Sequence, residues 1–126
     1  MATIREIMSS SLITVDAEST VAQAATVMAE RRVGSALVMD GDSLAGIFTE
    51  RDIVRALSQD FDAPGHPIGH WMTKNPTTIG PDDSTDRALD IMLKGGFRHL
   101  PVLEEERVVG IVSIRDLSQA SSGSTG

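Results

Sequence analysis

The chain has 126 residues, of which 40% are hydrophobic and 23% charged, a composition typical of a folded protein with one domain or two small halves. It contains no cysteine, which excludes disulfides, thiolate nucleophiles and cysteine-ligated metals. Eleven basic and eighteen acidic residues give a formal net charge of -7, which disfavours nucleic acid and anionic membranes as main partners.

The first 59 residues predict a short helix or turn, a strand, a helix, two strands joined by a tight turn, and a helix. The first strand is Leu12–Val15, and Thr20 with Gln23 indicates a capping box that opens the first long helix. Apolar residues share one face of that helix at helical spacing: Val21, Ala24, Ala25 and Met28. The two later strands are Ala36–Met39 and Leu44–Phe48, separated by the Asp40-Gly41-Asp42 turn.

The second half predicts the same order of elements. A strand at Thr78-Ile79 precedes a helix whose apolar face is Thr85, Ala88, Leu89 and Met92, and Gly95-Gly96 ends this helix. Strands at Leu100–Leu103 and Val108–Val112 flank the Glu104–Glu106 turn. No apolar run approaches the roughly 20 residues that span a bilayer. The N-terminus has no basic segment followed by an apolar one, so we expect a cytoplasmic protein.

The two halves align as a repeat. Residues 4–54 match residues 68–118 without a gap, with Thr14 aligned on Thr78. The identical pairs are Ile4/Ile68, Met8/Met72, Thr14/Thr78, Ala24/Ala88, Met28/Met92, Val38/Val102, Gly46/Gly110, Arg51/Arg115 and Asp52/Asp116. The sequence therefore predicts repeat 1 at 1–59, a linker at 60–67, repeat 2 at 68–120 and a flexible Ser/Gly tail at 121–126. One repeat is too small to be stable alone, so we expect the two to pack together and form clefts at their junction.

A seven-residue block recurs at the end of the last strand of each repeat. The copies are Gly46-Ile47-Phe48-Thr49-Glu50-Arg51-Asp52 and Gly110-Ile111-Val112-Ser113-Ile114-Arg115-Asp116. A strand-to-helix junction presents backbone N–H groups and the positive end of the helix dipole, which favour a phosphate. The hydroxyl can contact phosphate or sugar, the carboxylate can accept hydrogen bonds from a ribose diol, and the arginine supplies countercharge. The same residues also fit ordinary helix caps with no ligand.

These features resemble a tandem pair of cystathionine-beta-synthase (CBS) domains, a Bateman module. The resemblance rests on the repeat order, both blocks, the Thr14-Val15 and Thr78-Ile79 strands, and the Phe97–Val102 segment. It implies an α+β fold of two βαββα repeats related by pseudo-twofold symmetry. It further implies adenosine-containing ligands (AMP, ADP or ATP, or NAD or S-adenosylmethionine), a regulatory role and a homodimer. AMP or ATP is the ligand we expect first.

The resemblance assigns residues to a ligand site. They include the hydroxyls and carboxylates of both blocks, the apolar residues before them, the threonines of the first strands, and the basic pair before Pro101. The full set is Thr14, Ile47, Thr49, Arg51, Asp52, Thr78, Arg98, His99, Pro101, Ile111, Ser113, Arg115 and Asp116. Gly34, Ser35 and Leu37 stand in repeat 1 where Arg98, His99 and Pro101 stand in repeat 2. We therefore expect one strong site and one weak or vacant site.

Other functions have less support. His66 and His70 have a metal-ligand spacing, but Pro67 and Gly69 intervene and no acid completes the set. The sequence shows no activated nucleophile and no pair of side chains suited to acid–base catalysis, so nothing indicates an enzyme. We therefore expect neither catalytic residues nor a metal. The main alternative is an interaction scaffold that keeps the fold without useful ligand affinity. The regulated partner is not visible in the sequence.

Overall fold

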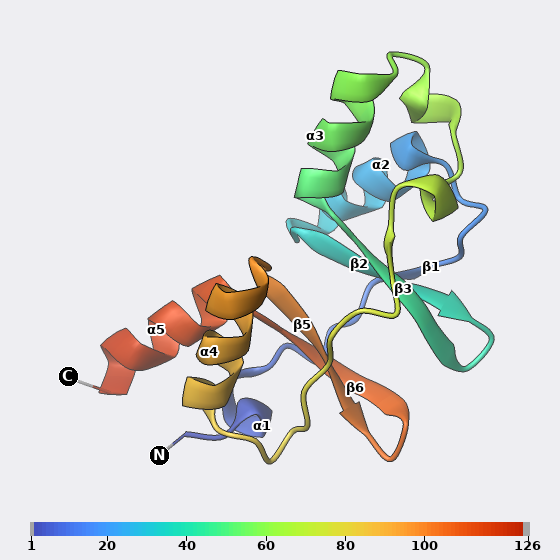
Figure 1. Cartoon of the computed structure of the whole chain (residues 1–126). Coiled ribbons are helices and arrows are strands. Elements are labelled where there is room, and N and C mark those ends of the chain that lie inside the picture. Colours follow the sequence, from blue (N-terminus) through green and yellow to red (C-terminus); the bar gives the residue numbers. More distant parts are fainter. Residues whose placement is uncertain (1, 125–126) are drawn as a thin grey trace. The chain divides into compact units, whose positions relative to one another are not determined.

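The structure is a computed structural model that describes residues 2–124, with side chains described up to residue 120. Its elements, in chain order, are α1 (Ile4–Ile7), β1 (Thr14–Val15), α2 (Val21–Arg31), β2 (Ser35–Asp40), β3 (Ser43–Thr49), α3 (Glu50–Gln59), the 3-10 turns η1 (Ala63–Gly65) and η2 (Ile68–His70), β4 (Thr73–Lys74), α4 (Thr85–Gly95), β5 (His99–Glu104), β6 (Arg107–Ser113) and α5 (Ile114–Ser124) (Figure 1). The order confirms the expected α+β fold of two tandem repeats.

The chain forms two compact units whose boundaries differ from those of the repeats. One unit is Ile13–Pro76, and the other combines Met1–Leu12 with Thr77–Gly126. Each unit therefore contains the sheet of one repeat and the opening segment of the other. We describe the two units separately.

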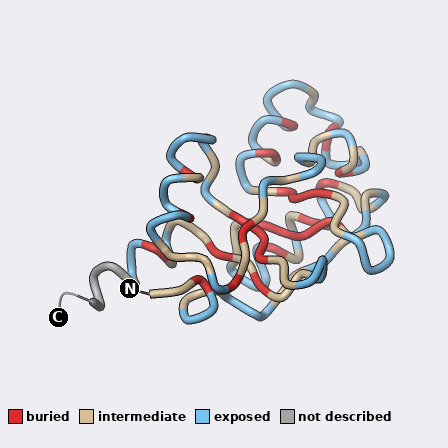
Figure 2. Tube along the Cα trace, turned by 60° about the horizontal axis from the view of Figure 1, so that its bottom comes forward, coloured by how far each residue is buried: buried red, intermediate tan, exposed pale blue. Residues whose placement is uncertain are grey.

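In the unit Ile13–Pro76, the strands form one sheet in the order β1-β2-β3-β4. β1 runs parallel to β2, and the other neighbouring strands are antiparallel. One sheet face packs Ala36, Val38 and Phe48 against the apolar stripe of α2. Figure 2 shows the buried residues concentrated along these central strands.

The segment that we assigned to a linker is an ordered part of this unit. His66 accepts a backbone hydrogen bond from Val21, and Ile68 donates one to Ser19. Ala63 and Ile68 are fully buried, and Ile68 belongs to the core around α2. Burial of Ala63 and Ile68, together with these two backbone hydrogen bonds, therefore holds residues 63–68 against the core around α2.

The other unit repeats this arrangement around the hairpin β5–β6. Isolated bridges Ile79↔Val102 (parallel) and Ser9↔Ile111 (antiparallel) stand where β1 and β4 stand in the first sheet, so the expected strand at Thr78-Ile79 is reduced to one bridge. Both hairpins have a register shift at the same aligned place, after Val38 and after Val102. Ile4, Ala88, Met92, Leu100 and Val112 are among the buried residues of this core.

Two features lie near the chain ends of this unit: the ion pairs of Arg5 in α1, and a last helix, α5, that is longer than expected. Arg5 of α1 pairs with Glu104 and Asp82, and the hydrogen bond and charge of Glu104 raise the pKa of Arg5. α5 continues to Ser124 and so includes residues 121–124 of the segment we expected to be a flexible tail. Residues 125–126 of that tail lie outside the described residues.

Candidate functional site

The first candidate motif lies where β3 ends and α3 begins. Thr49 is the N-cap residue of α3, in an extended conformation. Its Oγ1 accepts a hydrogen bond from the backbone N–H of Asp52 at 3.3 Å, and its backbone N–H donates to Asp52 Oδ2 at 2.9 Å. Thr49 and Asp52 thus form a capping box, so the cap reading of this block is realised.

The second motif has the same local geometry. Ser113 Oγ accepts from the N–H of Asp116 at 3.1 Å, and the N–H of Ser113 donates to Asp116 Oδ2 at 2.8 Å. Both motifs thus place a hydroxyl and a carboxylate at the N-terminus of a helix of ten or more residues. This is the positive end of the helix dipole, where an anion is stabilised.

The repeated glycines of the blocks have a packing role. A Cβ at Gly46 would lie 2.6 Å from the carbonyl oxygen of Thr73, and a Cβ at Gly110 would lie 2.5 Å from Met8 Sδ. The opening segment of the other repeat passes over each glycine, so close approach explains the repeated glycine without a ligand.

Strand register brings several of the expected ligand residues together in each unit. His99 pairs with Ser113 and Pro101 with Ile111 across β5–β6. Because side chains alternate along a strand, these four residues share the face opposite the one that packs Leu100 and Val112 into the core. In the other sheet the corresponding pairs are Ser35↔Thr49 and Leu37↔Ile47.

The threonines of the first strands extend these faces differently. Thr14 is exposed and pairs with Leu37, which places it in line with Ile47. It lines a shallow surface hollow whose other lining residues are Val15, Asp16, Ser19, Met39 and Gly41. Thr78 is half-buried and precedes Ile79, which bridges Val102.

The arginines of the expected site lie at its edge. The carbonyl oxygen of Arg98 accepts a hydrogen bond from the N–H of Ile114 at 2.8 Å, which fixes Arg98 beside the second motif. Gly34 makes the equivalent bond with Glu50 beside the first motif. Arg51 and Arg115 are exposed residues in the first turns of α3 and α5. Arg98-His99 and Gly34-Ser35 thus occupy equivalent places in the two units, each beside its strand-to-helix motif, and they differ in their side chains.

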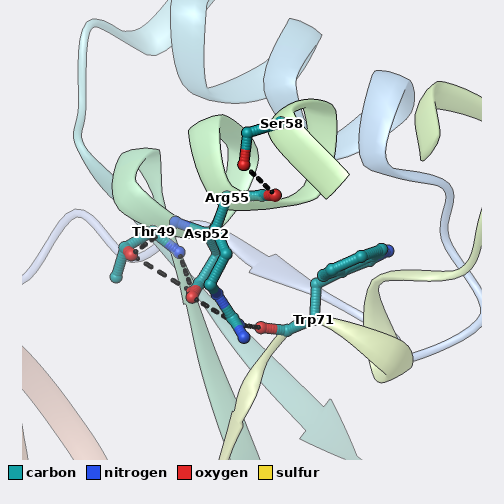
Figure 3. A network of polar contacts seen from close by, with 5 residues as sticks. All are labelled: Thr49, Asp52, Arg55, Ser58 and Trp71. Atoms are coloured by element: carbon teal, nitrogen blue, oxygen red, sulfur yellow. Dashed lines mark hydrogen bonds and ion pairs between the residues drawn. The ribbon is translucent and has the colours of Figure 1, made fainter. Parts of the chain in front are cut away.

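Two residues near Asp52, Arg55 and Trp71, were not assigned to the site from the sequence. Arg55 Nη2 pairs with Asp52 Oδ1 at 3.2 Å and donates to the carbonyl oxygen of Trp71 at 2.6 Å. The Arg55 guanidinium carbon lies 5.7 Å from the centroid of the Trp71 ring (Figure 3). Asp52 and Arg55 are three residues apart on α3, a spacing that favours such an ion pair. The contact with Trp71, however, is set by the fold.

The described part of the chain lacks two features, a metal-binding cluster and a membrane-spanning helix. No group of three or more His, Asp or Glu side chains there could hold a metal ion. None of the helices there is long and apolar enough to span a membrane.

A comparison with protein families decides the relationship of this chain. The family model of the CBS domain matches twice, at residues 4–59 and 68–123. The chain belongs to the CBS domain family. Both matched ranges contain one of the strand-to-helix motifs described above, and the resemblance inferred from the sequence is confirmed.

Individual proteins are similar to this chain over most of its length. An uncharacterized 17.7 kDa protein of Acidianus ambivalens is 43% identical over 120 residues, which are 93% of this chain and 71% of that protein. The structure of a putative signal-transduction protein with CBS domains from Burkholderia ambifaria matches with a TM-score of 0.94 and 32% identity, and the match covers 99% of this chain and 97% of that chain. Against several CBS proteins of Arabidopsis thaliana, this chain spans 21% of their length.

Some of the solved structures that are similar to this chain contain ligands. The CBS domain pair of protein MJ0100, in complex with 5'-methylthioadenosine and S-adenosyl-L-methionine, is 28% identical to this chain with a TM-score of 0.90, and the match covers 98% of each chain. Its fold is therefore the same as that of this CBS pair over nearly the whole length.

Proposed function

We propose that this chain is a regulatory module that binds adenosine-containing ligands at its two strand-to-helix motifs. The ligand class includes AMP, ADP and ATP, with NAD and S-adenosylmethionine as further candidates. A partner protein reads the ligand state, because a ligand that prefers one of two conformations shifts the population toward it. The role is regulatory rather than catalytic.

The observation that carries this proposal is the repeated motif geometry. In both repeats a hydroxyl and a carboxylate stand at a helix N-terminus, at the end of a strand. The helix end favours a phosphate, and the carboxylate supplies acceptors for a ribose diol. The similarity to the MJ0100 domain pair, which binds two adenosine derivatives, supports the same ligand class here.

The proposed site comprises the residues assigned from the sequence. In repeat 2, His99, Pro101, Ile111 and Ser113 share one sheet face, while Arg98 adds a positive charge that repeat 1 lacks. We therefore propose that the repeat 2 residues bind phosphate-bearing ligands more tightly than their repeat 1 equivalents.

Calorimetric titration with AMP, ATP, NAD and S-adenosylmethionine tests the proposal. Asp116→Asn is the sharpest variant, because the asparagine oxygen still accepts from the Ser113 N–H while its NH₂ group replaces a diol acceptor. We expect a loss of affinity of about tenfold to a hundredfold with near-normal melting. Binding that is unchanged in Asp116→Asn would overturn the assignment of this carboxylate.

A matched pair of serine caps separates capping from binding. Ser84 caps α4 by accepting from the Arg87 N–H at 3.1 Å, the same distance as in the Ser113 cap. Ser113→Ala and Ser84→Ala should lose similar stability, about 1 kcal/mol each, but only Ser113→Ala should lose nucleotide affinity. Equal affinities would assign Ser113 to capping alone.

The alternative function is an interaction scaffold without useful ligand affinity. The capping bonds favour it, because each motif carboxylate already satisfies its own backbone. Absence of saturable heat with every nucleotide would favour the scaffold and overturn the nucleotide proposal.

We also propose that the chain forms a homodimer, as the family resemblance implies. Exposed apolar side chains on and just after α3 support a contact with a second copy: Val54 is 68% exposed and Phe61 87%, and burial of such groups favours association. Sedimentation velocity should give the mass of a dimer. At about millimolar concentration, even a weak dimer of a few kcal/mol would be populated. A protein that stays monomeric up to that concentration would contradict this proposal.

A further inference from the structure

The carboxylate of the first motif has both oxygens occupied by the protein itself. Oδ2 of Asp52 accepts from the backbone N–H of Thr49 at 2.9 Å and from its hydroxyl at 3.1 Å. Oδ1 faces the guanidinium of Arg55 at 3.2 Å. Asp52 is only 6% exposed, so little of its carboxylate is accessible, and a ligand hydroxyl that approaches Oδ1 competes with the Arg55 guanidinium for it.

Arg55 is held in this position from its other side. The nitrogen that faces Asp52 also donates to the carbonyl oxygen of Trp71 at 2.6 Å, and the guanidinium lies over the indole ring at 5.7 Å. Cation–π attraction and a charge-assisted hydrogen bond both favour this arrangement. Figure 3 shows the Arg55 side chain reaching from α3, which also carries Asp52, to the carbonyl oxygen of Trp71.

The second motif lacks this arrangement. Oδ2 of Asp116 accepts from the Ser113 N–H, but among the described residues no hydrogen bond or ion pair reaches its Oδ1. The aligned positions explain the difference, since Gln119 stands where repeat 1 has Arg55 and Ile7 stands where it has Trp71. A neutral amide provides no cation for Asp116.

We propose that Arg55 is an internal competitor for the sugar diol at the first motif. In this inference, which rests on the proposed function, Arg55 must leave Asp52 Oδ1 before a ligand diol can donate to it. Among the described residues nothing pairs with Asp116 Oδ1, so in this proposal the second motif binds first. The difference in affinity between the two motifs therefore extends to ligands without phosphate. For such ligands the positive charge at Arg98 and His99 gives the second motif no advantage.

The test uses the full chain and 5'-methylthioadenosine, a probe that carries a diol and no phosphate. Asp116→Asn weakens the second motif so that the first dominates the titration. Adding Arg55→Gln to Asp116→Asn should tighten binding at the first motif about threefold to fivefold, the loss of a half-exposed ion-pair competitor. Arg87→Gln in the same background is the charge-matched control, because Arg87 of α4 pairs with Asp83, which precedes that helix, and it should leave the affinity unchanged.

The single tryptophan supplies a second readout. Trp71 is the only tryptophan in the chain, so its fluorescence reports on the Arg55 contact. Probe binding to Asp116→Asn should change the Trp71 emission as Arg55 withdraws, and Arg55→Gln should abolish most of that change. A reciprocal variant, Gln119→Arg, should place a cation beside Asp116 and weaken the second motif by a similar factor.

The outcomes distinguish the two proposals. Equal affinity of Asp116→Asn with and without Arg55→Gln, both melting normally, would overturn the competition by Arg55 while nucleotide binding stands. The competition by Arg55 is also overturned if the wild type binds one equivalent of the probe and neither Asp116→Asn nor Asp116→Asn with Arg55→Gln binds it. No saturable binding by wild type of this probe or of any nucleotide would overturn the proposed function, and the Arg55 inference with it.

Discussion

The carbonyl oxygen of Thr73 lies 2.6 Å from the point that a Cβ on Gly46 would occupy. A backbone atom cannot withdraw as a flexible side chain can, so Gly46→Ala must displace β4 from β3. We expect this substitution to lower the free energy of unfolding by about 1–3 kcal/mol, measured by urea denaturation.

Gly110→Ala and Gly65→Ala frame that result. At Gly110 the nearest atom is Met8 Sδ, on a side chain that can move, so the loss should be smaller than at Gly46. Nothing lies within 4 Å of a Cβ at Gly65, and Gly65→Ala should be neutral. Equal stability of all three variants would contradict the close-approach explanation.

The exchange of opening segments predicts that Ile68 stabilises the sheet of repeat 1. Ile68 is fully buried in the core with Met28 and Phe48. Ile68→Ala should therefore cost about 2–5 kcal/mol, measured by thermal and urea unfolding. Leu93→Ala is the control, because Leu93 is 67% exposed and should change stability by less than about 0.5 kcal/mol. Similar losses in both variants would argue against this core.

The C-caps of the two equivalent helices predict a stabilising substitution. Arg32 ends α2 with φ 57°, while Gly96 ends α4 with φ 74°. A non-glycine residue in this left-handed region costs about 1 kcal/mol, so Arg32→Gly should raise the melting temperature of the protein. Gly96→Ala should lower it. A lower melting temperature for Arg32→Gly would show that the Arg32 side chain contributes more than its backbone strain costs.

The second hairpin predicts another gain in stability. Glu105 and Glu106 both have positive φ, at 50° and 67°, and they connect β5 to β6 with two residues. This turn geometry favours Asn-Gly. The double variant Glu105→Asn, Glu106→Gly should raise the free energy of unfolding by about 1 kcal/mol, seen as a higher urea midpoint. An unchanged midpoint would indicate that the wild-type turn is unstrained.

Local patterns predicted much of the architecture. Thr20 with Gln23 forms the capping box that the spacing indicated, and Gly96 ends α4 in the left-handed region. The αβ order of the two repeats follows from the gapless alignment. The capping box and the helix end depend on residues three or four apart, so hydrogen bonding within one turn is sufficient to determine them.

The candidate site was predicted in part. The two aligned blocks predict that a strand ends and a helix begins at Thr49 and at Ser113, and β3 meets α3 and β6 meets α5 at those residues. The blocks alone could not distinguish a cap from a ligand site, because the same hydroxyl and carboxylate serve both. The assignment of these residues to a ligand stays a prediction.

Long-range contacts separate what the sequence determined from what the tertiary structure decided. The sequence by itself determined the duplication, most of the helices and strands, and the matched motifs, since these are local or repeated in order. Only the fold decided that Met8 covers Gly110, that residues 68–72 complete the core of repeat 1, and that Trp71 holds Arg55 against Asp52. Such contacts join residues between 16 and about 100 positions apart, and their partners are selected by shape and burial rather than by spacing.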